Sequence, residues 1–133
     1  MTFSASVAPP VGAEVSLARA RARLLSLTND FRAAHGVRLL REDPDLDLMA
    51  QRHSARMAEA RTLFHTANLG YKLRSYSVWG ENLGYGPRLR QVFRLWTQST
   101  SHRENLLDRR FRWVGIGVVY SRGVFWVTII FCG

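Results

Sequence analysis

Apolar residues recur at alternating spacings of three and four positions over the first part of the chain. This spacing places them on one face of a helix that ends at Gly36. Arginines fall between the apolar positions, and we expect them on the solvated face of the helix. The apolar positions are Leu17, Ala20, Leu24, Leu27, Phe31 and Ala34, and the arginines are Arg19, Arg23 and Arg32.

Residues 1–12 show no hydrophobic period and contain Pro9 and Pro10 among small and polar residues. They are typical of a flexible N-terminal arm. The first thirty residues hold no basic start followed by an apolar run, so we expect no signal peptide within this chain. A length of 133 residues favours one domain, which we place at residues 13–133.

A second helix is predicted to start at Asp43 and Pro44, because aspartate is a preferred N-cap residue and proline is favoured at the first helical position. Its inner face includes His53, which we interpret as a packing residue rather than a ligand. The whole inner face comprises Leu46, Met49, Ala50, His53, Met57 and Ala60.

The second half of the chain alternates between expected strands and helices. A short strand is predicted near residues 77–83, and Pro87 opens a third helix whose buried face contains Trp96. Ser101 and Glu104 have the capping-box spacing, which predicts a fourth helix with His102 in its first turn. Two apolar runs, 114–120 and 124–131, predict a hairpin covered on both faces. Gly115 and Gly117 interrupt the first run and indicate the close approach of another backbone or side chain.

Composition indicates a globular domain with a basic surface. The chain has 47% hydrophobic and 22% charged residues, and no stretch approaches the roughly 20 apolar residues of a membrane span. Nineteen Lys and Arg against ten Asp and Glu give a net charge of +9, which favours anionic partners. Cys132 is the only cysteine, so the core must hold the domain without an intramolecular disulfide.

Three residues at expected element ends could carry chemistry: His65, Glu81 and His102. A helix N-terminus disfavours imidazolium, which keeps His102 neutral and able to bind a metal. Two imidazoles and one carboxylate with an open position suit zinc. The alternative is that all three are hydrogen-bonded polar groups of loops and helix ends. Phosphate-loop, paired-cysteine and RNA-binding patterns are absent, and no specific nucleic acid is expected.

Several short motifs follow one another along the chain. The motifs are Leu63-Phe64-His65, Gly80-Glu81-Asn82-Leu83, Trp96, Ser99, His102-Arg103, Asn105-Leu106-Leu107 and Gly115-Ile116-Gly117. Their order and spacing resemble the CAP superfamily, which comprises cysteine-rich secretory proteins, antigen 5 and plant pathogenesis-related proteins. The bacterial branch without disulfides is the most similar. The resemblance covers about residues 17–133 and includes Asn29, Arg32, Gly36, Leu40 and the segment 50–58.

The resemblance implies an α/β/α sandwich around a small antiparallel sheet, with a central cavity lined by two histidines and two acidic residues. His65, Glu81 and His102 fall on three of these positions, and the fourth falls near Ser99. Because this position holds a serine, the site has one carboxylate fewer than the family pattern, which implies weaker binding of a divalent cation. Members of the family are mostly secreted, which implies an extracellular or cell-envelope location. Asn82 and Asn105 are expected to tie backbone groups together, and Trp96 to belong to the core.

Three functions remain open on these grounds. The first is a binding module whose cavity takes a divalent cation, zinc before others, or a small or lipidic ligand. The second is a metal-dependent hydrolase with Glu81 as the candidate base. The third is an adhesion module for anionic envelope polymers, which would bring Arg109, Arg110 and Arg112 onto one surface with Arg88, Arg90 and Arg94.

Overall fold

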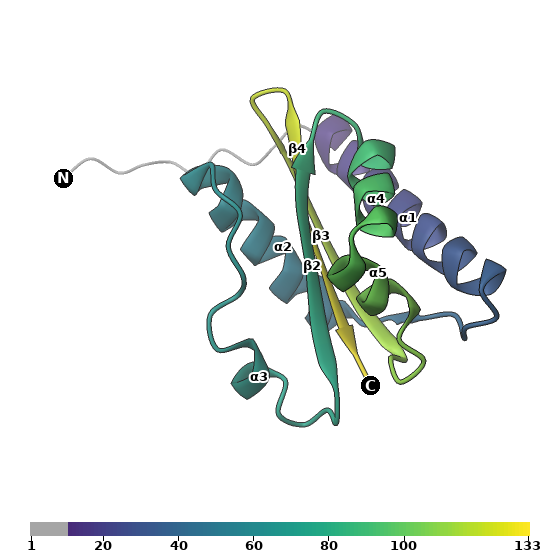
Figure 1. The fold of residues 1–133 in the computed structure, drawn as a ribbon. Coiled ribbons are helices and arrows are strands. Elements are labelled where there is room, and N and C mark those ends of the chain that lie inside the picture. Colours follow the sequence, from purple (N-terminus) through teal and green to yellow (C-terminus); the bar gives the residue numbers. More distant parts are fainter. Residues whose placement is uncertain (1–10) are drawn as a thin grey trace.

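One four-stranded sheet lies between two layers of helices (Figure 1). The computed structural model describes residues 11–133. The first ten residues of the expected arm lie outside this range, and the described part of the chain starts directly with a helix. The elements are α1 (Val11–Ala34), β1 (Arg41–Glu42), α2 (Pro44–Ala60), α3 (Leu69–Lys72), β2 (Trp79–Gly86), α4 (Leu89–Gln98), α5 (Thr100–Leu107), β3 (Trp113–Ser121) and β4 (Val124–Cys132).

The sheet has the strand order β1-β3-β4-β2. The predicted hairpin is confirmed: β3 and β4 pair antiparallel from Trp113 with Cys132 to Ser121 with Val124. Arg122 and Gly123 form the two-residue turn, with φ values of 54° and 82°, as a tight hairpin requires. The antiparallel pairing of β2, β4 and β3 agrees with the expected sheet, and the two-residue strand β1 adds a parallel pairing with β3. The sheet is therefore mixed, with β2 and β1 at its edges.

Helix α2 lies against one face of the sheet at unusually short range. Asp43 caps this helix as predicted, with its side chain accepting from the backbone N–H groups of Asp45 and Leu46. A Cβ built on Gly115 would lie 2.3 Å from the carbonyl oxygen of Leu46. A Cβ on Gly117 would lie equally close to the carbonyl oxygen of Ala50. The two glycines therefore allow the backbone of α2 to rest directly on β3, as the sequence indicated.

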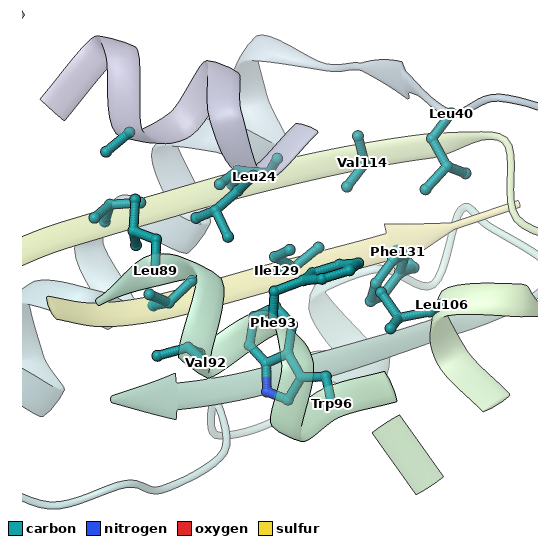
Figure 2. Close-up of a cluster of buried hydrophobic side chains, with 14 of the residues drawn as sticks. Leu24, Leu40, Leu89, Val92, Phe93, Trp96, Leu106, Val114, Ile129 and Phe131 are labelled. Carbon is teal, nitrogen blue, oxygen red and sulfur yellow. The ribbon is translucent and has the colours of Figure 1, made fainter. Parts of the chain in front are cut away.

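Helices α1, α4 and α5 cover the other face, where the larger apolar cluster lies (Figure 2). Leu24 of α1 and Trp96 of α4 are almost fully buried, in agreement with the predicted helix stripes. Phe111 and Phe131 stack in the same cluster with ring centroids 5.4 Å apart. Within residues 11–133, no helix has the length and apolar character needed to cross a membrane.

Arg32 is fully buried, so the expectation that it belongs to a solvated helix face is wrong. Its guanidinium donates to four backbone carbonyl oxygens at 2.7 to 3.3 Å. Burial lowers the pKa of Arg32 to about 10, which leaves the side chain charged at neutral pH. Arg32 thereby joins the end of α1 to the end of α5. The four carbonyl groups belong to Arg38, Leu106, Asp108 and Phe111.

Two other boundaries differ from the sequence-based expectations. The short helix α3 was not predicted, because four residues are too few to show a period. Helix α5 starts at Thr100 with Ser99 as the N-cap, so the predicted capping box of Ser101 and Glu104 is wrong. His102 still lies in the first turn of the helix, as expected.

Candidate functional site

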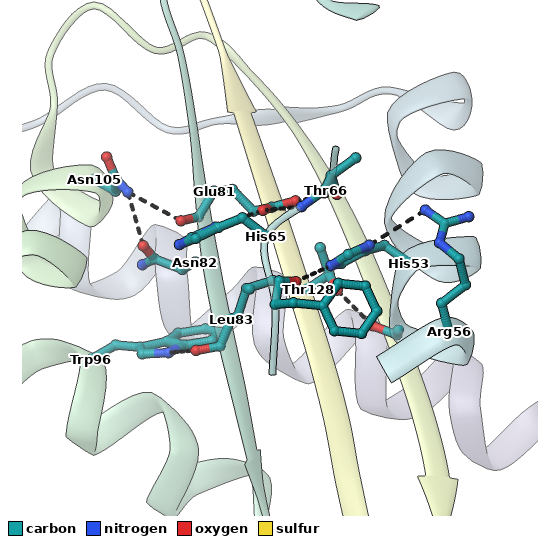
Figure 3. A network of polar contacts seen from close by, with 12 residues as sticks. His53, Arg56, His65, Thr66, Glu81, Asn82, Leu83, Trp96, Asn105 and Thr128 are labelled. Atoms are coloured by element: carbon teal, nitrogen blue, oxygen red, sulfur yellow. Dashed lines mark hydrogen bonds and ion pairs between the residues drawn. The ribbon is translucent and has the colours of Figure 1, made fainter. Parts of the chain in front are cut away.

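Glu81 lies in the edge strand β2 and is directed toward the loop that follows α2 (Figure 3). Its Oε1 atom accepts from Nδ1 of His65 at 2.8 Å and from the backbone N–H of Thr66 at 3.0 Å. Its Oε2 atom accepts from the hydroxyl of Thr66. Both carboxylate oxygens are therefore engaged within the protein. Thr66, which the sequence analysis did not single out, supplies two of these three bonds.

The loop that carries His65 is held in place by His53 of α2. Nε2 of His53 is hydrogen-bonded to the carbonyl oxygen of Phe64, and the two rings meet edge to face with centroids 5.0 Å apart. Burial lowers the pKa of His53, so the ring stays neutral at neutral pH. His53 is 1% exposed, which confirms its interpretation as a packing residue. Its effect on the site is indirect, because it holds Phe64, the residue before His65.

Ser99 and His102 form a second polar pair at the start of α5. Nδ1 of His102 shares a hydrogen bond of 2.8 Å with Oγ of Ser99. The hydroxyl of this N-cap residue is therefore bound to an imidazole instead of a backbone N–H. The ring of His102 also stacks on Trp96, with centroids 6.4 Å apart and planes 20° from parallel. Burial lowers the pKa of His102, and the charge that His65 can carry lowers it further.

Side chains from α4 and α5 bind the free edge of β2. Val78 and Gly133 exchange backbone hydrogen bonds, so the backbone groups of Val78 face the chain of β4. This direction alternates from residue to residue along a strand, so Glu81 and Leu83 direct their carbonyl groups away from β4. Trp96 Nε1 donates to the Leu83 carbonyl at 2.8 Å, and Asn105 donates to that of Glu81 at 3.4 Å. These bonds attach α4 and α5 to the strand that carries Glu81 (Figure 3).

The two asparagines of the motifs have the expected role. Asn82 donates to the carbonyl oxygen of His102 at 3.0 Å, and Asn105 donates to Oδ1 of Asn82, also at 3.0 Å. Both amides therefore fix backbone and side-chain groups within the domain. The core assignment of Trp96 also holds, since only 2% of this residue is exposed.

The four expected site residues line two hollows that lie along β2. His65 and Glu81 line a hollow of about 420 Å³, together with Trp79 and Asn105. Ser99 and His102 line a hollow of about 300 Å³ with mainly apolar walls, among them the exposed side chain of Leu95. The structure thus brings the four residues together as two pairs.

A divalent cation fits the imidazoles of this site better than it fits the carboxylate. His65 and His102 each have Nδ1 in a hydrogen bond, which leaves Nε2 as the available nitrogen. Glu81, expected as the third ligand, instead orients the ring of His65. Within residues 11–133, no three His, Cys, Asp or Glu side chains form a group arranged to hold a metal ion. Cys132 adds no nucleophile, since burial raises its pKa to about 12.

Comparison with known proteins agrees with this architecture. The profile of the cysteine-rich secretory protein family, CAP, matches residues 25–131. The chain is 28% identical over 111 residues to YkwD of Bacillus subtilis (strain 168), a protein described as uncharacterized. This alignment covers 77% of the chain and 43% of YkwD.

Solved structures of bacterial proteins have the same fold. An extracellular protein containing an SCP domain from Bacillus anthracis superimposes with a TM-score of 0.80 at 25% identity, over 96% of this chain and 45% of that protein. A cysteine-rich secretory protein from Staphylococcus aureus has a TM-score of 0.74 at 22% identity, over 98% and 42% of the two chains. The chain spans less than half the length of each of these three proteins. With the family profile matched over most of its length, this chain belongs to the CAP family.

Proposed function

We propose that this chain is a binding module of the extracellular space or cell envelope, in which His65 and His102 together capture a divalent cation weakly. The location is supported by the Bacillus anthracis relative, which is described as extracellular. The observation that carries the cation site is the orientation of the two rings. Each Nδ1 is hydrogen-bonded, to Glu81 or to Ser99. Histidines that bind metals are held in this way, with the other ring nitrogen directed to the ion.

The affinity of such a site is modest for a physical reason. Two neutral nitrogens would hold the ion, water would fill its other positions, and no ionised side chain contributes a direct bond. A bound cation would supply Lewis acidity, while this chain's residues position it. Protons compete for both imidazoles, so binding should fade in mild acid. The lowered pKa of His102 keeps that ring available at neutral pH.

The same geometry favours binding over hydrolysis. A hydrolase built here would use Glu81 to take a proton from water. The Glu81 side chain is only 2% exposed, and both its oxygens already accept hydrogen bonds from His65 and Thr66. A small or lipidic ligand remains a proposal for the neighbouring hollow, supported by its apolar walls and by the exposure of Leu95 and Tyr85.

Calorimetric titration with zinc chloride tests the cation site. The unmodified chain should bind one ion, and both His65→Ala and His102→Ala should weaken binding by about tenfold or more, as loss of a direct ligand does. His35→Ala is the matched control, because His35 is an exposed histidine at the end of α1 whose Nδ1 is bound to the Phe31 carbonyl. Equal zinc affinity in His102→Ala and the unmodified chain would overturn the proposal.

A further inference from the structure

Two stretches of the helical layer formed by α1 and α4 carry positive charges only. Between Asn82 and Arg103 the chain contains three arginines and no Asp or Glu. Between Ser16 and Asn29 it contains three more arginines and again no acidic residue. These stretches include α4 and most of α1, which lie side by side on the same face of the sheet (Figure 1).

Three of these arginines surround one hollow. Arg88, Arg90 and Arg94 are exposed and line a depression of about 500 Å³, together with Pro87 and Gln91. Among the residues whose side chains the structure describes, the two ion pairs are His65 with Glu81 and Arg110 with Asp108. The three guanidinium groups around the hollow therefore have no carboxylate partner within that part of the chain.

Helix α1 adds further exposed arginines to the same helical layer. Arg19 and Arg23 are exposed on α1, and Phe31 of the same helix meets Phe93 of α4 edge to face, with centroids 6.0 Å apart. The two helices are therefore in contact, and both carry exposed arginines.

We propose that the hollow of Arg88, Arg90 and Arg94 binds a phosphate-bearing polyanion. The planar guanidinium fork matches phosphate oxygens in pairs, and successive arginines add contacts along a polymer. A membrane surface is the less suitable partner, because membrane-bound surfaces add apolar side chains to cations. Pro87 is the only apolar residue that lines this hollow.

The second arginine group considered for adhesion takes no part in this surface. Arg109, Arg110 and Arg112 lie between α5 and β3, at the end of the sheet opposite the start of α4 (Figure 1). Arg110 is also paired with Asp108, at 2.7 Å. The polyanion surface is thus confined to the α1 and α4 layer and is separate from the proposed cation site of His65 and His102.

Fluorescence anisotropy with labelled long-chain inorganic polyphosphate tests this surface. The variant Arg88→Gln/Arg90→Gln/Arg94→Gln should bind about tenfold more weakly, because contacts to phosphate are lost directly. The matched control is Arg41→Gln/Arg52→Gln/Arg112→Gln, which changes three exposed arginines outside α1 and α4. Both variants have the same net charge, since +9 minus 3 is +6. The control should lose less than about threefold, the effect of general charge alone.

Three results would overturn the proposal: equal losses in both triple variants, polyglutamate bound as tightly as polyphosphate, or vesicles of anionic phospholipid bound more tightly than polyphosphate. Circular dichroism confirms that each variant is folded. Zinc calorimetry on the α4 variant separates the two proposals, because its zinc affinity should equal that of the unmodified chain whether or not polyphosphate binds.

Discussion

Glu81 and His65 are joined by a hydrogen bond of 2.8 Å although their environments are opposite. The carboxylate is 2% exposed, whereas the imidazole is 74% exposed. The direction of a solvent-facing ring is therefore set by a group that solvent barely reaches. A buried carboxylate that accepts three hydrogen bonds serves here as the anchor of the loop after α2.

Replacing Glu81 by alanine should destabilise the fold by about 1–3 kcal/mol, because the buried N–H and hydroxyl of Thr66 lose their acceptor. Urea denaturation at neutral pH measures the free energy of unfolding. Glu59→Ala is the control, since Glu59 is an exposed glutamate of α2, and it should change stability by no more than about 0.5 kcal/mol. Equal stability of the two variants would show that Glu81 anchors nothing.

Gly117→Ala should force α2 away from the sheet. Its new Cβ would lie 2.3 Å from backbone atoms of Ala50, which cannot move aside as a flexible side chain could. We expect a loss of about 3 kcal/mol, at the upper end of overpacking effects. Gly123→Ala, at a turn with φ of 82° and no atom within 4 Å, should lose only the backbone strain of about 1–2 kcal/mol. A lower melting temperature for Gly123→Ala than for Gly117→Ala would contradict the close approach of α2 to β3.

Stability should fall as the pH drops from 7 toward 5, partly because of His53. Burial lowers its folded-state pKa, so the unfolded chain takes up protons first as the pH falls through the ordinary value of about 6.5. The stability that the neutral ring provides is thus complete above that pH and is lost progressively below it. Glu81 raises this pKa in part, and Arg56 lowers it.

His53→Gln isolates this effect from other titrating groups. Urea denaturation at pH 7 and pH 5 should show a smaller difference in unfolding free energy for the variant than for the unmodified chain. His35→Gln should keep the full pH dependence, because His35 is exposed. An unchanged pH dependence in His53→Gln would mean that the buried ring does not contribute.

The sequence was sufficient where local pattern determines structure. Helical spacing predicted α1, α2 and α4, and the run of apolar residues around Arg122 and Gly123 predicted the central hairpin. The motif order predicted one cavity for His65, Glu81, Ser99 and His102, and the structure places them as two pairs in two hollows. These features depend on neighbours in the chain or on a whole motif set, so they can be read without coordinates.

The missed features depend on contacts between distant residues. Arg32 donates to carbonyl groups more than 70 positions away in the chain. Hydrophobic periodicity cannot predict these bonds, because it assigns every charged residue to the solvent-exposed face of a helix. Strand β1 has only two residues, both exposed, and so shows no strand pattern. The role of Glu81 as an anchor depends on Thr66, whose backbone N–H and hydroxyl gave no signal in the sequence.

The pairing of His65 and His102 as one site is tested most directly by long-range proton–nitrogen NMR of the chain labelled with ¹⁵N in its histidine rings. His65 should carry its proton on Nδ1, as its bond to Glu81 requires. On addition of zinc, the Nε2 signals of His65 and His102 should shift together at the same zinc concentration, while those of His35 and His53 stay unchanged. Movement of only one of the two rings, or an equal shift of exposed His35, would contradict the shared site.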